Sequence, residues 1–303
     1  MAVEYTPGGQ YVDGEWREPA GEASIPVTNP TTEETLAEVA TATEAEVAAA
    51  IEAAEDARYD WGKRPAQERG QLVRAVGEVL DDHREELAEL VVAEQGKPIS
   101  DARGEIDGAA DMAQYMAEWD RRIEGDILPG ESREESIHLQ RRPVGVVAAI
   151  APWNYPVAVF VRKFAPALVA GNTVVAKPSE ETPLATLRLA ELIDENVDLP
   201  DGVFNLVTGD GSVGAQLVSS PTVDMVSMTG NVETGKQIMA DAAANLTKVS
   251  LELGGKAPAI VWKDADVDQA VEDVLTARTT NTGQVCTCAE RVYVHADVRA
   301  EFE

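Results

Sequence analysis

One loop near the end of the sequence, residues 281–288, carries both cysteines of the chain, Cys286 and Cys288. A cysteine in a glycine-containing loop can expose a thiolate, which is the nucleophilic form of the side chain. The usual partner base is histidine, but none of the three histidines lies in a context that suggests this role. The pattern therefore disfavours a Cys-His protease, and a buried apolar thiol is the simpler alternative for either cysteine taken alone.

Two further side chains could serve acyl chemistry. Asn154 lies in a turn between two prolines, where its amide could donate to an oxyanion, although an Asn that bonds its own turn is the alternative. Glu252 lies between two leucines, and desolvation by them would raise its pKa toward that of a general base. The alternative for Glu252 is a strand glutamate on a solvated face. A metal site is poorly supported, because the two cysteines have no nearby histidine pair.

Glycines and polar side chains follow several short apolar runs, where a parallel sheet would place a dinucleotide. Lys177 could meet ribose hydroxyls or phosphate, and Glu180 would repel a 2′-phosphate, which favours NAD over NADP. The loops at 209–214 and 229–235 each carry glycines before a helical stretch. Ordinary glycine turns, and a lysine before a proline turn, are the alternatives for these features.

The elements that would position these residues form an alternating pattern between residues 144 and 262. Such alternation predicts a mostly parallel sheet with helices on both faces, and ligands of such sheets bind beyond the carboxyl ends of the strands. The expected strands are Val144–Ile150, Thr173–Ala176, Val203–Val207, Val223–Met228, Val249–Leu253 and Ala257–Val261, and the expected helices lie near Val157–Val169, Leu184–Asn196, Val213–Ser219 and Glu233–Ala244.

The first 130 residues have a different pattern. Turn signals and short apolar runs occupy residues 1–40, and Thr43 with Glu46 then forms a capping box that begins a helix. A longer helix is expected from Pro65 to Gly96, and another from Ser100 to about Ile123 with its aromatic side chains inward. After a Pro-Gly turn, residues 136–142 alternate like a strand.

Composition narrows the functional classes. The 303 residues include 54 Asp and Glu against 25 Lys and Arg, a formal net charge of −29, with 44% hydrophobic residues. The chain can bury a core, and its charge argues against nucleic-acid or anionic-membrane binding. The absence of a long apolar run, a signal peptide and a disulfide framework predicts a cytoplasmic protein. Evenly spread acidic residues and few lysines predict adaptation to high salt.

Five short motifs in a fixed order are more informative than any one of them. In chain order they are Pro-Trp-Asn, Lys-Pro-Ser-Glu, a Thr-Gly pair with a second glycine five residues later, Glu-Leu-Gly-Gly-Lys, and Gly-Gln-x-Cys. This order resembles the aldehyde dehydrogenase superfamily over essentially the whole sequence. The segments 115–119, 225–230 and 286–294 look most like those of lactaldehyde and glycolaldehyde dehydrogenases. Members of that family are longer, so we expect a chain truncated on its C-terminal side.

The resemblance implies a mechanism. Cys286 would attack the aldehyde to give a thiohemiacetal and then a thioester, while Asn154 and the Cys286 backbone N–H hold the oxyanion. Glu252 would activate water, and NAD, with NADP less favoured, would accept the hydride. The implied cofactor contacts are Ile150, Pro152, Trp153, Lys177, Ser179, Glu180, Gly209, Gly214, Thr229, Gly230, Asn231, Gly235, Leu253 and Gly254.

The resemblance also implies an architecture. Residues 1–130 and 143–253 would form a discontinuous Rossmann-type NAD-binding domain, 131–142 an oligomerisation β-arm, and 254–303 the first part of an α/β catalytic domain. The full-length protein would be a homo-oligomer, a dimer or tetramer, that acts on a small hydroxyaldehyde. A semialdehyde or betaine aldehyde is the alternative substrate, and an inactive NAD-binding fragment is the alternative function. Cys288 is interpreted as a pocket-wall residue, and Asn231, where many relatives have Ser, as a helix cap or an amide donor near phosphate.

Overall fold

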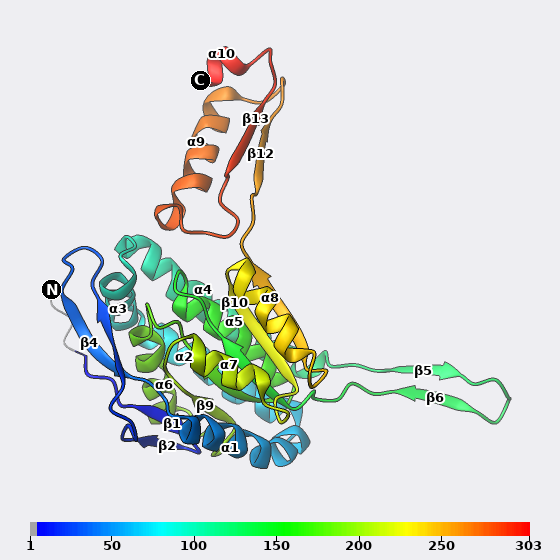
Figure 1. The fold of residues 1–303 in the computed structure, drawn as a ribbon. Coiled ribbons are helices and arrows are strands. Elements are labelled where there is room, and N and C mark those ends of the chain that lie inside the picture. The colour runs from blue at the N-terminus through cyan, green and yellow to red at the C-terminus, as the bar shows by residue number, and fades with distance from the viewer. Residues whose placement is uncertain (1–4) are drawn as a thin grey trace.

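A seven-stranded sheet forms the centre of the computed structural model, which describes residues 5–303 (Figure 1). The strand order is β11-β10-β7-β8-β9-β1-β2, and the five strands from β11 to β9 are parallel. Strands β1 and β2 join the far edge in antiparallel pairing. The bounds are β1 Gln10–Val12, β2 Glu15–Arg17, β7 Val146–Ile150, β8 Thr173–Lys177, β9 Phe204–Leu206, β10 Met225–Gly230 and β11 Lys248–Leu253.

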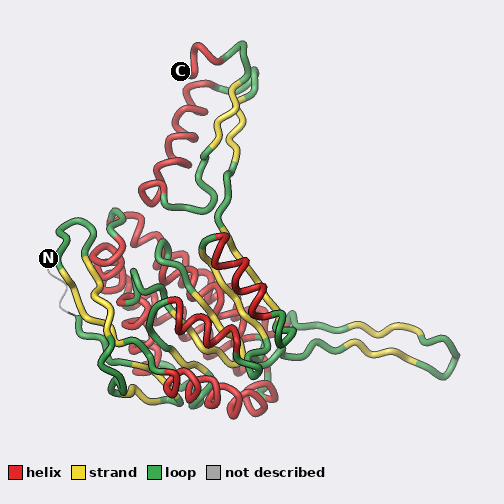
Figure 2. Tube along the Cα trace, in the orientation of Figure 1, coloured by secondary structure: helices red, strands yellow, loops and turns green. Residues whose placement is uncertain are grey.

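Helices cover both faces of this sheet (Figure 2). One hydrophobic core joins the sheet to helices α2 to α6, and a second core joins it to α1, α7 and α8. The predicted parallel sheet with helices on both faces is therefore confirmed. The bounds are α1 Glu44–Lys63, α2 Ala66–Asp82, α3 Arg84–Gln95, α4 Ile99–Ala117, α5 Pro156–Val169, α6 Leu184–Asn196, α7 Gly211–Ser219 and α8 Val232–Ala242.

The two cores divide the side chains of each central strand between them. In β7, Val147 and Ala149 pack into the first core, whereas Val146 and Ala148 pack into the second. Successive side chains of a strand point to opposite faces, so a strand covered on both sides must be apolar throughout. This requirement explains why the central strands read as continuous apolar runs in the sequence.

The N-terminal helices differ in part from the prediction. The capping box is confirmed, because the Thr43 hydroxyl accepts from the Glu46 backbone N–H while the Glu46 carboxylate accepts from the Thr43 backbone N–H. The helix expected from Pro65 to Gly96 is two helices that meet at His83, whose ψ of 20° leaves the helical range. Without a proline or glycine at His83, the sequence carries no breaker signal there.

The last helix of this region is shorter than predicted. Helix α4 ends at Ala117, and a short 3-10 helix, Glu118–Arg121, follows it. Tyr115 is 50% exposed and Trp119 is 39% exposed, so the expected inward aromatic stripe is wrong. Small residues of α4, such as Ala109 and Ala113, are buried instead, which allows close approach of the neighbouring helices.

Two small sheets flank the main one. Strands β3 (Ser24–Thr28) and β4 (Thr35–Ala40) form one hairpin. Strands β5 (Asp126–Pro129) and β6 (Ser136–Leu139) form another, which extends far from the sheet (Figure 1). Every residue of β5 and β6 is exposed. The hairpin begins before residue 131, the predicted start of the arm, because β6 needs a hydrogen-bonded partner strand.

The last segment of the chain stands off from the main sheet (Figure 1). Strands β12 (Pro258–Val261) and β13 (Arg291–Val294) pair in parallel beside helix α9 (Val267–Thr279), and a short helix α10 (Arg299–Phe302) ends the segment. Four large hydrophobic side chains of this unit are more than half exposed: Ile260, Trp262, Leu275 and Tyr293.

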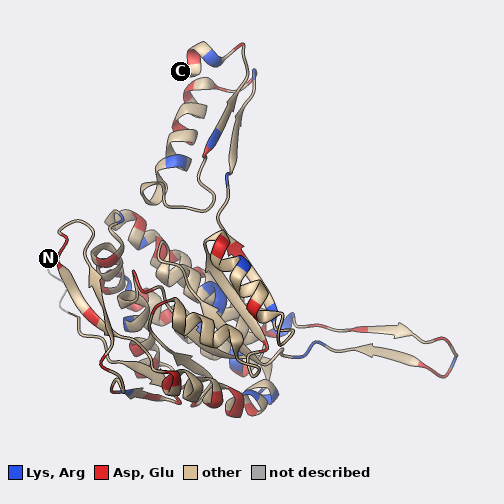
Figure 3. Ribbon diagram, viewed as in Figure 1, with Lys and Arg blue, Asp and Glu red and all other residues tan. Residues whose placement is uncertain are grey.

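Charge is distributed over the whole surface. Asp and Glu occur on most of the helices (Figure 3), whereas strands β1, β7, β9 and β10 of the central sheet contain no charged residue. Within residues 5–303, no helix has the length and apolar character needed to cross a membrane. In the same range, no group of three or more His, Cys, Asp and Glu side chains could hold a metal ion.

Candidate active site

The register of the parallel strands brings the predicted residues to one edge of the sheet. Ile150 at the end of β7 pairs with Lys177 at the end of β8 and with Met228 in β10. Thr229 pairs with Glu252 of β11. Four strands therefore end side by side, and the loops that follow them share one space.

A cleft of about 1460 Å³ occupies that space. All three predicted catalytic residues line it, together with most of the predicted cofactor contacts. Those lining it are Asn154, Glu252, Cys286, Ile150, Pro152, Trp153, Lys177, Ser179, Glu180, Gly214, Thr229, Gly230, Asn231, Leu253 and Gly254.

Two predicted cofactor contacts, Gly209 and Gly235, are not among the residues that line the cleft. Gly209 has a φ of +144°, and a Cβ there would lie 2.5 Å from Val213 Cγ2. A Cβ on Gly235 would lie 2.7 Å from Leu253 Cδ2, so this glycine lets helix α8 pack closely on β11. Both glycines are thus explained by backbone conformation and packing, and their contact with a cofactor stays a prediction.

The N-terminus of α8 is the better anion site of the two glycine loops. Asn231 is the N-cap of α8, and its side-chain oxygen accepts from the backbone N–H of Thr234 at 2.8 Å. This confirms the expected capping role of Asn231. The N-cap of α7 is Asp210, whose carboxylate already accepts from Ser212 N at 2.8 Å. A phosphate would meet the Asp210 carboxylate at the cap of α7, whereas the cap of α8 is uncharged and the Glu233 carboxylate in its first turn is paired with Lys236 at 2.8 Å.

Lys177 and Glu180 form the polar end of the cleft beyond β8. The Lys177 amine is buried, donates to the carbonyl of Pro178 at 3.0 Å, and lies 3.3 Å from Glu180 Oε2. Burial lowers the pKa of Lys177, and the Glu180 carboxylate opposes that shift. The carboxylate remains 38% exposed, so it can still accept from a ligand hydroxyl.

The nucleophile candidate lies on an irregular loop. Cys286 is exposed and lines the cleft. A Cβ on Gly255 would lie 3.3 Å from the Cys286 carbonyl, so the loop rests against the chain just after β11. Cys288 is buried, does not line the cleft, and its thiol contacts the carbonyl of Gly283 at 3.2 Å. Its interpretation as a pocket-wall residue is therefore wrong.

Asn154 joins the turn after β7 to this loop. Its amide nitrogen donates to the Gln284 carbonyl at 2.8 Å, and its own backbone carbonyl accepts from Asn281 Nδ2 at 3.1 Å. An amide nitrogen carries two hydrogens, so one remains for a ligand in the cleft. Asn154 thus bonds across to another loop, whereas the alternative was an Asn that bonds its own turn.

Glu252 is exposed on β11. The expected desolvation by its leucine neighbours is therefore not met in this structure. The reason is topological, because β11 is the edge strand of the sheet and its cleft-facing side is open to solvent. The carboxylate nevertheless lines the same cleft as Cys286 and Asn154.

Two basic residues that the sequence analysis missed also line the cleft, Arg162 and Lys163 of α5. Lys163 is buried and donates to Ser227 Oγ at 3.3 Å. Burial lowers its pKa to about 8, and the nearby Glu252 carboxylate opposes the shift. The sequence does contain a feature that points to these two residues, because the Arg-Lys pair interrupts an otherwise apolar helix that begins just after Asn154.

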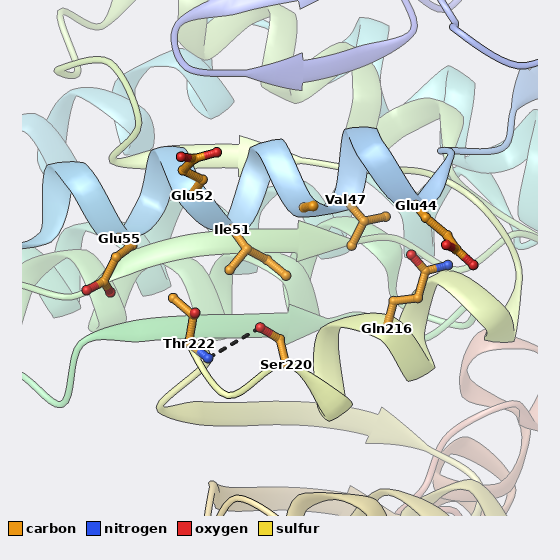
Figure 4. A pocket seen from close by; sticks show the side chains of 9 residues that line it. Glu44, Val47, Ile51, Glu52, Glu55, Gln216, Ser220 and Thr222 are labelled. Carbon is orange, nitrogen blue, oxygen red and sulfur yellow. Dashed lines mark hydrogen bonds between the residues drawn. The ribbon is translucent and has the colours of Figure 1, made fainter.

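A second, smaller hollow of about 430 Å³ lies between α1 and α7 (Figure 4). Its rim carries three carboxylates, Glu44, Glu52 and Glu55, and its floor includes Val47 and Ile51. None of the predicted site residues lines it. The hollow is therefore separate from the candidate active site.

Comparison with known proteins agrees with the geometry of the large cleft. The model of the aldehyde dehydrogenase family matches residues 16–303. The chain belongs to the aldehyde dehydrogenase family. A crystal structure of lactaldehyde dehydrogenase from Escherichia coli superposes with a TM-score of 0.96 at 45% identity, covering 98% of this chain and 62% of that one.

Two curated members of the family illustrate the range of relatives. The 3,6-anhydro-alpha-L-galactose dehydrogenase of Vibrio sp. (strain EJY3) is 47% identical over 96% of this chain and 61% of its own length. The NADP(+) succinate-semialdehyde dehydrogenase of Escherichia coli (strain K12) is 44% identical over 96% of this chain and 60% of its own length. The chain thus spans about three-fifths of the length of the curated relatives it matches.

Proposed function

We propose that this chain is the cofactor-binding and nucleophile-bearing part of an enzyme that oxidises an aldehyde to a carboxylic acid with NAD. The observation that carries the proposal is the shared cleft. The cleft is lined by the Cys286 thiol, the Asn154 amide and the Glu252 carboxylate. At the same edge of the sheet lie the N-terminus of helix α8, which follows β10, and the Lys177–Glu180 pair, which follows β8.

The cleft suits a dinucleotide. Gly214 and Gly254 line it, and a Cβ on either residue would meet no atom closer than 3.7 Å, so bare backbone faces the open space. The first turn of α8, capped by Asn231, offers backbone N–H groups to a pyrophosphate. Lys177 and Glu180 would bind ribose hydroxyls, and the Glu180 carboxylate favours NAD over NADP.

The protein groups would divide the chemistry among them. The Cys286 thiolate adds to the aldehyde carbon, and Asn154 with the Cys286 backbone N–H holds the resulting oxyanion. NAD, when bound, takes the hydride from that carbon. Glu252 then removes a proton from the water that attacks the Cys286 thioester. The acid leaves, and the Cys286 thiolate is restored.

A small hydroxyaldehyde is the proposed substrate. Arg162 and Lys163 give one wall of the cleft a positive character, which opposes the cationic betaine aldehyde. A semialdehyde is the second candidate, because its carboxylate could pair with Arg162. A panel of lactaldehyde, glycolaldehyde, succinate semialdehyde and betaine aldehyde, assayed by NADH formation, separates these substrates. Equal rates on all four would refute the hydroxyaldehyde preference.

The Cys286→Ala variant tests the mechanism. It should abolish NADH formation, whereas Cys288→Ala should retain it because that thiol lies outside the cleft. Steady-state activity in the Cys286 variant would exclude the proposed nucleophile. Glu252→Gln should release one equivalent of NADH in a burst and then accumulate the acyl-enzyme, which mass spectrometry detects as added mass on Cys286.

A catalytically silent fragment is the competing function, because the chain covers only part of its relatives' length. Calorimetry with NAD beside an NADH-formation assay discriminates between the two. Binding without turnover supports the silent fragment, and turnover that depends on Cys286 supports the enzyme.

We also propose the domain assignment and assembly. The cofactor domain would consist of residues 1–130 and 143–253. An arm at residues 131–142 would pack on a second copy of the chain, and residues 254–303 would form part of the catalytic domain. The arm's apolar side chains support the assembly, because Ile137 is 47% exposed and Leu139 is 48% exposed. A nucleophilic Cys286 must stay reduced, which favours a cytoplasmic location.

A further inference from the structure

Three charged side chains at the beginning of helix α4 face the two loops that carry Asn154 and Cys286. Lys97 lies two residues before the first residue of the helix, and its fully buried amine donates to Glu105 Oε2 at 2.6 Å and to the Asn154 backbone carbonyl at 2.7 Å. The same amine lies 3.9 Å from the centre of the Tyr155 ring. Lys97 therefore contacts the turn after β7 at two neighbouring residues, through a hydrogen bond to Asn154 and a cation–π contact with Tyr155.

Glu105 completes the hold on that turn. Its second oxygen, Oε1, accepts from the backbone N–H of Val157 at 2.9 Å and of Ala158 at 3.1 Å. These are N–H groups of the first turn of α5, whose own N-cap residue, Tyr155, makes no side-chain cap bond. Glu105 thus supplies from α4 the cap that α5 lacks in its own sequence.

Asp101 reaches the other loop. Its Oδ2 accepts from the backbone N–H of Asn281 at 2.9 Å. Asn281 and Thr282 have φ values of 49° and 54°, in the left-handed region, which Asn adopts more often than most residues but a β-branched Thr rarely adopts. Such a conformation persists only where the surroundings hold it. Asp101 helps to hold this conformation through its hydrogen bond, although it lies outside both the cleft and the loop at residues 281–288.

The two loops are also bonded to each other. The Asn154 amide donates to the Gln284 carbonyl, and the buried Asn281 side chain donates to the Asn154 carbonyl. The backbone carbonyl of Asn154 therefore accepts hydrogen bonds from Lys97 and Asn281, and the backbone N–H of Asn281 is in turn bonded to Asp101. The relative position of Asn154 and Cys286 depends on the first two turns of α4.

We infer that Asp101, Lys97 and Glu105 are positioning residues that keep the Asn154 amide and the Cys286 loop in one fixed arrangement. The catalytic consequence rests on the proposed function, since it concerns the oxyanion that Asn154 would bind. None of the three residues lines the cleft, so they act through Asn154 and Asn281. Asp101 is the best of the three residues to substitute, because it is only half-buried. Lys97 and Glu105 form a buried ion pair, and removal of either partner would endanger folding.

The test compares three variants of the full chain. Asp101→Ala removes the acceptor, Asp101→Asn keeps a side-chain oxygen that can accept from Asn281, and Asp111→Ala alters an exposed aspartate on the same helix. Hydrogen–deuterium exchange of the peptide spanning 281–288 reports the loop without any need for turnover. In Asp101→Ala we expect exchange at least about tenfold faster, because a bond to a charged acceptor is lost. The other two variants should match the wild type.

Kinetics supply the second readout. If the wild type forms NADH, Asp101→Ala should lower kcat by about 10²-fold through misplacement of the reacting groups. The dissociation constant for NAD should not change, because Asp101 lies outside the cleft. Asp101→Asn should restore kcat, which a purely destabilising effect would not predict.

The two hypotheses can fail separately. Unchanged exchange in Asp101→Ala would overturn the positioning inference whatever the activity. Faster exchange with an unchanged kcat would overturn its catalytic part. A wild type that binds NAD without forming NADH would refute the proposed function, and the exchange result would then decide the positioning inference alone.

Discussion

The side-chain amide of Asn154 donates to the backbone carbonyl of Gln284 at 2.8 Å, two residues before Cys286. One N–H of the amide is therefore committed to holding the loop, which leaves the second for a ligand in the cleft that Asn154 lines. A single side chain serves both the conformation of the thiol loop and the proposed oxyanion contact. This double use makes Asn154 more sensitive to substitution than an oxyanion donor alone would be.

Replacement of Asn154 by Asp tests that sensitivity. The substitution keeps the shape, removes both N–H donors and sets a carboxylate against the Gln284 carbonyl. We expect kcat to fall by at least about 10²–10³-fold, the effect of losing one oxyanion donor, with little change in NAD affinity. Steady-state NADH formation and calorimetry measure the two quantities. The exposed Asn245→Asp is the control, and equal losses in both variants would contradict the prediction.

Glu180 should set the choice between NAD and NADP. Its carboxylate lies 3.3 Å from the Lys177 amine at the end of β8. Glu180→Gln removes the charge that repels a 2′-phosphate, so we expect the ratio of NADP to NAD affinity to rise about tenfold, equivalent to ~1.4 kcal/mol. Glu78→Gln removes the same charge from exposed surface on α2. An equal gain in that control would assign the effect to the net charge of the protein.

Lys163 should give the protein a pH-dependent stability. Burial lowers its pKa from the ordinary 10.5 to about 8. Between these values the unfolded chain binds the proton more strongly, so the free energy of unfolding rises with pH and the gain is lost as pH falls through about 8. The shift corresponds to about 3 kcal/mol.

Urea unfolding of wild type and Lys163→Met at a series of pH values isolates this contribution. The difference in unfolding free energy, wild type minus variant, should increase from pH 7.5 to pH 10.5 by up to about 3 kcal/mol. Lys236→Met, whose side chain is 66% exposed, should show no such trend. A constant difference for Lys163→Met would show that the amine is not desolvated.

Salt should stabilise the fold. The net charge of −29 is spread over the surface (Figure 3), and self-repulsion of that charge opposes the folded state. Screening lengths shorten from about 30 Å at 0.01 M salt to about 3 Å at 1 M. The midpoint of thermal unfolding should therefore rise between low and molar KCl, most steeply at low concentration. A midpoint that is flat or falls would refute adaptation to high salt.

Much of the sheet could be predicted from the sequence because each central strand is buried on both faces. That burial requires an apolar run, and the chain ends each run with residues that break the pattern, such as Lys177 and Gly230. The register of parallel strands then places those ends together, so the cleft followed from local signals.

The errors arose where a residue's environment depends on distant elements. Glu252 has leucine neighbours in sequence, but β11 is an edge strand, and its exposure follows from strand order. The local sequence marked Lys163 as a charge within an apolar helix, but its burial against the sheet and its lowered pKa depend on distant elements. The break at His83 has no proline or glycine to mark it. Packing of α2 and α3 against other helices determines that break, and no local rule reports it.

The pairing of β1 with β9 joins Tyr11 to Leu206. On the ribosome, the N-terminal hairpin must therefore wait for β9 to be synthesised, about 10–40 s at ~5–20 residues per second. Strands β7 and β8 are made before β9, whereas β10 and β11 follow it, and the last strand of the sheet is complete at Leu253. Only afterwards does Cys286 leave the exit tunnel. The order of synthesis thus delivers the Cys286 thiol to a cleft whose sheet has already been made.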